Sequence, residues 1–189
     1  MRRKIHPHLI EKGGAVLVVV DMQEKLVPLM VKGKEVTENI IKLIRFCRAC
    51  KIPIILTEQY PRGLGGTVQE IRKELEDTLP IEKTSFSCFG SKDFRNALKR
   101  FKANTLIITG IEAHVCILQT ALEALEKYRI HVIADAVSSH TVENIQIALQ
   151  RMRDAGVEIS STEMLMYELL RDSKTKEFKE VKQLLRITS

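Results

Sequence analysis

Low-complexity sequence is absent from this chain, which has 189 residues but only 9 glycines and 5 prolines. No tract is repetitive, and 44% of the residues are hydrophobic. This composition excludes disorder as the main state. It is typical of one globular domain, and a chain of this length can bury a sizeable core.

Long hydrophobic runs are also missing. No apolar run approaches the roughly 18 residues that a membrane-spanning helix needs. The basic start, residues 1–8, lacks the apolar stretch of a secretory signal. We therefore expect a cytoplasmic protein with no membrane partner. We assign residues 1–14 to an N-terminal tail and residues 15–189 to a single domain.

Aromatic residues make up only 5% of the chain, which leaves little for stacking on nucleic-acid bases. The formal net charge is +6. Arg2, Arg3 and Lys4 carry part of it, and the other cations are mixed with acidic residues rather than grouped in one stripe. We predict no nucleic-acid partner, and a nucleic-acid function remains a rival that only the net charge supports.

Cysteine is scarce, and its spacing does not indicate a metal site. Among the 4 cysteines, Cys47 and Cys50 have CxxC spacing, but a second ligand pair at zinc spacing is missing. Nothing signals secretion, so disulfides are not expected. Cys47 continues an apolar helical stripe that begins at Ile40, which favours a core position. We predict neither a metal nor another cofactor.

Strands and helices alternate along the chain. Continuous apolar, β-branched runs predict strands buried on both faces at residues 15–20, 52–56, 105–109, 130–134 and 157–160, with a short segment at 81–84. Helical periodicity predicts helices at residues 36–50, 68–75, 91–101, 115–125, 142–152, 164–170 and 176–185, and breakers predict a loop at 61–66. The pattern predicts an α/β fold, a parallel sheet with helices on both faces.

In such a fold, ligands bind beyond the carboxyl ends of the strands. The residues expected at that edge are Asp21, 58–60, Lys83, 110–116 and 135–140. Functional side chains are therefore sought there.

Cys116 follows a predicted strand and Gly110, at the start of a helix. The positive end of a helix dipole favours a thiolate, and backbone N–H groups there can stabilise an oxyanion. Cys116 is therefore a candidate nucleophile. The alternative is a packed small residue without chemistry.

Asp21 and Lys83 are the candidate partners of this thiol. Apolar surroundings at the end of a buried strand would raise the pKa of Asp21 and make it a usable base. A lysine beside the thiol would favour the thiolate. Alternatively, Asp21 is a helix cap or turn residue, and Lys83 is a surface residue paired with Glu82. The chemical interpretation gains weight because Cys116 is expected at the same edge of the sheet.

Several motifs together resemble one family, the isochorismatase-like cysteine hydrolases, and within it the isochorismatase domain-containing branch. The resemblance covers about residues 15–170 and rests on a combination of motifs, since each is weak alone. The matching stretches are Val20–Gln23, Leu56–Gly65, Glu82–Ser87, Gly110–Thr120, Asp135–Ser139 and Ala148–Gly156.

The resemblance implies a doubly wound sheet of about six parallel strands in the order 3-2-1-4-5-6. It implies a catalytic triad of Asp21, Lys83 and Cys116, and a cis peptide between Ile111 and Glu112. The N–H groups of Glu112 and Cys116 would form the oxyanion hole. It also implies a thioester intermediate and a small amide or related C–N substrate, with no metal needed. Relatives usually form homo-oligomers, and we expect one here.

Two activities of related proteins do not fit this sequence. Nicotinamidases carry a metal site with an aspartate and two histidines after the second strand, whereas residues 58–62 contain no histidine. Isochorismatases proper hydrolyse a vinyl ether without a cysteine nucleophile, and Cys116 argues against that reaction. The remaining candidate ligands are assigned to the tail (His6 and His8) and to pocket or loop positions (His114 and His140).

Four further side chains are predicted to bind substrate: Gln23, Gln59, Tyr60 and Phe86. Gln23 would act by orienting Asp21 or the local backbone. Tyr60 and Phe86 would line the pocket, although packing of the loops explains them equally well. The sequence thus predicts a cysteine hydrolase of a small-molecule amide. The alternative is a catalytically silent binding or scaffold protein with the same fold.

Overall fold

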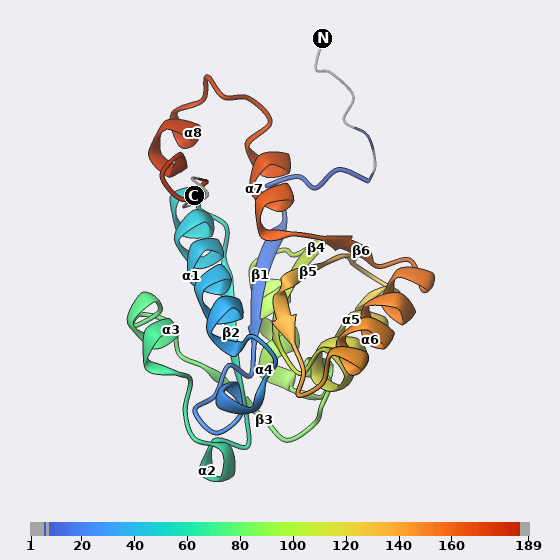
Figure 1. Ribbon diagram of the computed structural model, residues 1–189. Coiled ribbons are helices and arrows are strands. Elements are labelled where there is room, and N and C mark those ends of the chain that lie inside the picture. Colours follow the sequence, from blue (N-terminus) through green and yellow to red (C-terminus); the bar gives the residue numbers. More distant parts are fainter. Residues whose placement is uncertain (1–5, 7, 186–189) are drawn as a thin grey trace.

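The computed structural model describes residues 6 and 8–185. Its centre is one six-stranded parallel sheet with the strand order β3-β2-β1-β4-β5-β6 (Figure 1). The predicted α/β fold and strand order are therefore confirmed. The strands are β1 (Ala15–Val20), β2 (Ile54–Gln59), β3 (Ile81–Lys83), β4 (Thr105–Ile111), β5 (Arg129–Ser138) and β6 (Glu158–Ser160).

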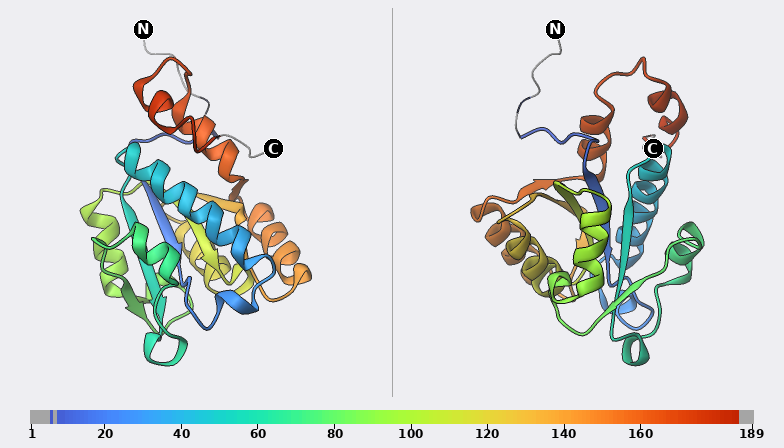
Figure 2. Two further views of the ribbon diagram at one scale, coloured as in Figure 1. Left: turned by 60° about the vertical axis from the view of Figure 1, so that its left-hand side comes forward. Right: turned by 180° about the vertical axis from the view of Figure 1, so that it is seen from behind.

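Helices cover both faces of the sheet (Figure 2). One face carries α1 (Gly33–Ala49), α7 (Thr162–Leu170) and α8 (Lys176–Val181), and α1 contacts both of the others. The other carries α4 (Lys92–Arg100), α5 (Leu118–Ala124) and α6 (Val142–Asp154). Between β2 and β3 lie α2 (Pro61–Leu64) and α3 (Gln69–Glu74), and α3 packs against α1.

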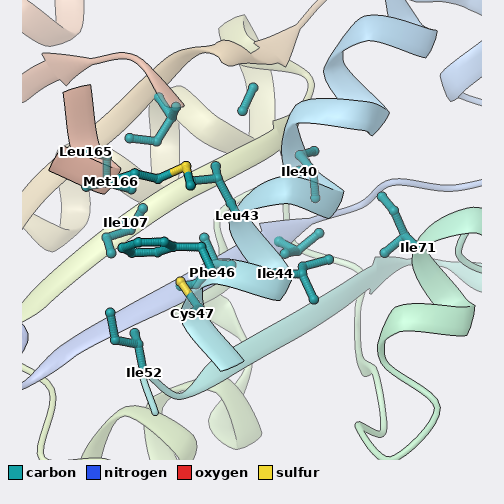
Figure 3. Packing of buried hydrophobic residues seen from close by; sticks show 14 of the residues in the cluster. Ile40, Leu43, Ile44, Phe46, Cys47, Ile52, Ile71, Ile107, Leu165 and Met166 are labelled. Atoms are coloured by element: carbon teal, nitrogen blue, oxygen red, sulfur yellow. The ribbon is translucent and has the colours of Figure 1, made fainter. Parts of the chain in front are cut away.

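The two faces bury separate hydrophobic clusters, because successive side chains of a strand point to opposite faces. In β1, Leu17 and Val19 join the cluster under α1, and Val16 and Val18 join the cluster under α4 to α6. Figure 3 shows the first cluster, in which Cys47 lies fully buried. The prediction of Cys47 as a core residue is confirmed.

Several element bounds differ from the prediction; β2, for example, spans Ile54–Gln59 rather than residues 52–56. Two further local predictions were wrong. Residues 61–64 form a single helical turn rather than a loop, with Pro61 in the first helical positions, where proline's missing N–H costs nothing. The strand predicted to end at residue 134 runs on to Ser138. Asp135 is therefore inside β5, where its carboxylate accepts hydrogen bonds from the N–H and the hydroxyl of Thr162 at 2.8 and 3.0 Å, away from the candidate site.

The first residues of the described chain already contact the domain. Ile10 is fully buried, and its N–H donates to Glu168 at 3.2 Å. Positions 1–5 and 7 of the predicted tail lie outside the described residues, and the boundary at residue 14 stays a prediction. Within the described chain, no helix combines the length and the apolar character needed to cross a membrane.

Gly110 allows β4 to lie close to β1 just before the candidate nucleophile. Its φ is +111°, and a Cβ there would overlap the carbonyl oxygen of Val20. Gly110→Ala should therefore lower the free energy of unfolding by about 3 kcal/mol, from backbone conformation and overlap together. Gly156→Ala is the matched control, because its φ is +99° but its surroundings are open. It should cost about 1 kcal/mol. Equal losses in urea denaturation would contradict this account.

His131 lies in β5 and is 2% exposed. Burial and the nearby Arg129 lower its pKa to about 4. In the unfolded chain it binds a proton below about pH 6.5, so its contribution to stability is complete above that pH and is lost as the pH falls to about 4. The unfolding free energy of the wild type should fall between pH 7 and 4. In His131→Leu we expect this fall to be smaller by up to about 3 kcal/mol. Identical pH profiles for the two proteins would contradict this expectation.

Candidate active site

Asp21, Lys83 and Cys116 meet at the carboxyl edge of the sheet. Asp21 directly follows β1, Lys83 ends β3, and Cys116 lies in a π-helical turn, Ala113–Ile117, after β4. The Lys83 ammonium is 2.6 Å from Oδ2 of Asp21 and 3.7 Å from the Cys116 sulfur. Each of the three residues is at most 6% exposed. Asp21 and Lys83 thus form a buried ion pair in contact with a thiol.

Polar groups of β2 and of the loop after β3 complete the surroundings of this pair. Thr57 donates its hydroxyl to Oδ1 of Asp21 at 2.7 Å, and Lys83 donates to Oε1 of Gln59 at 2.8 Å. Burial tends to lower the pKa of Lys83, but Asp21 and the neighbouring thiols outweigh it and raise that pKa. Lys83 therefore stays protonated.

The resting state of Cys116 differs from the sequence-based expectation. Burial, followed by the charge of Asp21, raises the pKa of its thiol to about 12, and Lys83 opposes this rise only in part. The helix-dipole argument favoured a thiolate, but Cys116 lies inside the π-helical turn, ahead of α5, and is almost fully buried. The resting group is a thiol, so its attack on a substrate would need a base.

The two glutamines hold the loops around the ion pair. Gln23 is fully buried and donates to the carbonyls of Gln59 and Gly65 at 3.0 and 2.7 Å, while its Oε1 accepts from the N–H of Gln59. Gln59 also donates to the carbonyl of Thr84 at 2.8 Å. These contacts connect β1, β2 and the loop after β3, and they leave Gln23 as a support of the local backbone.

A pocket of about 490 Å³ opens beside Lys83, and Tyr60 and Arg62 line part of it. Tyr60 is 54% exposed. Phe86 is equally exposed, and its carbonyl accepts from Lys83 at 3.2 Å. The described lining includes Lys83 but not Cys116, which is 6% exposed.

Backbone hydrogen bonds hold the segment between β4 and the π-helical turn. The peptide bond between Ile111 and Glu112 is cis. The carbonyl of Glu112 accepts from the N–H groups of Val115 and Ile117 at 3.1 and 3.2 Å. Glu112, which precedes this turn, and Cys116 within it carry the two N–H groups for which an oxyanion-binding role is predicted.

Sequence reasoning missed two features of this edge. Thr57 lies in β2, where it is paired with Val20, and its place directly after the apolar run of residues 52–56 was the available signal for its contact with Asp21. Glu112, His114 and His140 form a group that can hold a metal ion, with one ligand atom of each within 4.8 Å of the others. No spacing rule reveals it, because His140 is far from the other two in sequence.

Comparisons with known proteins agree with this architecture. Residues 15–164 match the isochorismatase domain. Isochorismatase domain-containing protein 2 of Danio rerio is 41% identical over 174 residues, which cover 91% of this chain and 87% of the relative.

Two solved structures have the same fold. The structure of MAR1 ribonuclease from Caenorhabditis elegans has a TM-score of 0.90 and 36% identity, covering 95% of this chain and 93% of that one. The YcaC gene product of Escherichia coli, described as an octameric hydrolase of unknown specificity, has a TM-score of 0.87 and 24% identity, covering 96% and 92%. From the matched domain and the similarity to the Danio rerio protein, the chain belongs to the isochorismatase family.

Proposed function

We propose that this protein is a cysteine hydrolase that cleaves a small amide or related C–N bond through a thioester. The observation that carries the proposal is the buried Lys83 ammonium, which contacts both the Asp21 carboxylate and the Cys116 sulfur. Membership of a hydrolase family supports it. A silent scaffold of the same fold would have no need to bury an ion pair beside a thiol.

In the first half-reaction, Asp21 accepts the thiol proton while the Cys116 sulfur attacks the substrate carbonyl carbon. A proton acceptor is needed because the pKa of this thiol is raised to about 12. Lys83 stabilises the negative charge on sulfur, and the N–H groups of Glu112 and Cys116 bind the oxyanion. Asp21 then returns the proton to the leaving nitrogen, the C–N bond breaks, and a thioester remains on Cys116.

In the second half-reaction, Asp21 accepts a proton from water as the water oxygen attacks the thioester carbonyl. The C–S bond breaks, the acid is released, and the proton returns to the sulfur. Both halves use the same base and the same oxyanion donors. The chemistry needs only residues of this chain.

The pocket beside Lys83 would receive the substrate. Its volume of about 490 Å³ suits a small molecule. Tyr60, Arg62 and Ser85 give its wall aromatic, cationic and hydroxyl groups. Gln23 would position the loops, because its amide donates hydrogen bonds to backbone carbonyls. Gln59 would position Lys83, because its amide oxygen accepts a hydrogen bond from the ammonium.

The test is a screen of small amides with the wild-type protein, Cys116→Ala and Cys50→Ala. Cys50 is partly exposed and directly follows α1, so its variant is a control for the general loss of a thiol. We expect hydrolysis by wild type and Cys50→Ala, none by Cys116→Ala, and an acyl adduct on Cys116 in rapidly quenched samples. Equal hydrolysis by Cys116→Ala would overturn the proposal.

Ribonuclease activity is a second candidate, because the similar Caenorhabditis elegans structure is described as a MAR1 ribonuclease and this chain has a net charge of +6. Contacts with phosphates weaken steeply as salt rises, whereas turnover of a small neutral amide should barely respond. RNA cleavage that falls steeply with salt and persists in Cys116→Ala would favour this second function over the first.

We also propose that the protein forms a homo-oligomer, because the similar YcaC structure is described as octameric. Light scattering from the full chain measures the assembly directly. A mass of one chain at all concentrations would contradict this proposal.

A further inference from the structure

Three metal-binding side chains gather beside the end of β4, outside the ion pair and thiol. Glu112 directly follows β4, His114 belongs to the π-helical turn, and His140 follows β5. One ligand atom from each lies within 4.8 Å of the others. We propose that Glu112, His114 and His140 bind a divalent transition-metal cation of the Zn²⁺ type.

The sheet itself brings these residues together. β4 and β5 are parallel neighbours, and Ile111 is paired with Ser138. The residues that follow the two strands therefore leave the sheet side by side. The grouping depends on the register of β4 and β5 and not on the orientation of a free loop.

The present contacts already resemble those of a metal site without its ion. Nδ1 of His140 is 2.8 Å from Oε2 of Glu112, and the rings of His114 and His140 have centroids 5.3 Å apart. A cation bound between Glu112 and His140 would take the place of the contact between them. Because zinc–nitrogen and zinc–oxygen bonds are about 2.0–2.2 Å long, small side-chain rotations would bring all three ligands to bonding distance.

Ser139 supplies the second contact that metal-binding histidines usually have. Its hydroxyl is 2.9 Å from Nδ1 of His114. Such a contact fixes the ring orientation and leaves the other nitrogen, Nε2, for the metal. Ser139 is fully buried, so its position is set by the packing of the chain after β5.

The donor set selects the class of cation. Two imidazoles and one carboxylate suit Zn²⁺ and neighbouring transition metals, whereas Mg²⁺ and Ca²⁺ prefer oxygen ligands. Three protein ligands leave a further position for water. The side chain of His140 is 52% exposed, so a cation can enter from solvent.

This site is separate from the proposed hydrolysis, which needs no metal. It also lies elsewhere than the stretch after β2, residues 58–62, where a nicotinamidase-type site would be sought. The carboxylate of Glu58 in that stretch already accepts hydrogen bonds from the N–H and the hydroxyl of Thr67, at 2.7 and 2.6 Å. The cation would instead hold the side chain of Glu112, whose own N–H is a proposed oxyanion donor.

The test is a calorimetric Zn²⁺ titration of the untagged full chain, repeated with Co²⁺ and followed by visible absorption. We expect one cation per chain. His114→Gln and His140→Gln should each raise the dissociation constant at least about 10-fold, and Ser139→Ala should raise it about 10-fold. Dissociation constants are compared only among variants whose unfolding midpoint equals that of the wild type.

Two control variants separate this site from other sources of binding. His8→Gln is the matched control, because His8 also contacts a glutamate, Glu158, but belongs to no three-ligand group among the described residues. Cys116→Ala removes the thiol nearest to the group's segment. Both variants should bind like wild type, and Co²⁺ should give no thiolate charge-transfer band. Absence of binding, unchanged binding in His140→Gln, or loss of binding in Cys116→Ala would overturn the proposal.

Discussion

Asp21→Asn is expected to slow amide turnover by roughly 10²–10⁴-fold while making Cys116 easier to alkylate. The amide keeps the shape of the carboxylate but cannot accept the thiol proton or return it to the leaving nitrogen. The charge of Asp21 raises the pKa of Cys116, so its removal lowers that pKa. Turnover and thiol reactivity should therefore change in opposite directions.

The measurement combines turnover with the pH profile of Cys116 alkylation, read from peptide masses. In wild type, the alkylation rate should rise with pH toward the pKa of about 12, and in Asp21→Asn the rise should begin at lower pH. Thr57→Val is the matched control, because it removes the 2.7 Å hydrogen bond to Asp21 without changing charge. It should reduce turnover far less. Turnover within 10-fold of wild type in Asp21→Asn would exclude Asp21 as the base.

Continuous apolar runs in the sequence were sufficient to predict strands such as β1, whereas the order of the strands was implied by the family resemblance. Residues 15–20 are all buried in β1, as the unbroken apolar run predicted. The prediction failed at the end of β5, where a charged residue interrupts the apolar run. Asp135 follows the run at residues 130–134 and was therefore placed after the strand. In the structure Asp135 is exposed, its carboxylate accepts hydrogen bonds from Thr162, and β5 continues to Ser138.

The location of the candidate site also followed from general rules of the fold. Asp21 and Lys83 were expected at the carboxyl edge, and the structure brings them into contact with Cys116 there. Their catalytic roles stay predictions. The pKa of Cys116 was not predictable, because it depends on burial and on the distance of two charges, which tertiary packing sets.

The group of Glu112, His114 and His140 was likewise not predictable from the sequence. A search by spacing finds ligands that lie on one turn, helix or loop. Here the ligands come from the ends of two parallel strands, and their proximity depends on the register of β4 and β5. Sequence spacing alone contains no signal for such a group.

Lys83→Met is expected to lower turnover by about 10²–10³-fold and to slow alkylation of Cys116 at neutral pH, because the cation that stabilises the developing thiolate is lost. Lys83 opposes the rise in the pKa of Cys116, so its removal raises that pKa further. Alkylation should therefore begin at higher pH than in wild type. This is the opposite of the change expected for Asp21→Asn, although both substitutions impair turnover.

Loss of stability is the main confounding effect in this experiment, and a double variant separates it from chemistry. Asp21 and Lys83 form a buried pair 2.6 Å apart, and removal of one partner of such a pair costs about 3–5 kcal/mol of unfolding free energy. Asp21→Asn combined with Lys83→Met leaves no unpaired charge, so it should regain most of that stability without regaining turnover. Recovery of turnover together with stability would show that neither Asp21 nor Lys83 takes part in the chemistry. Unchanged turnover and alkylation in Lys83→Met would remove Lys83 from the mechanism.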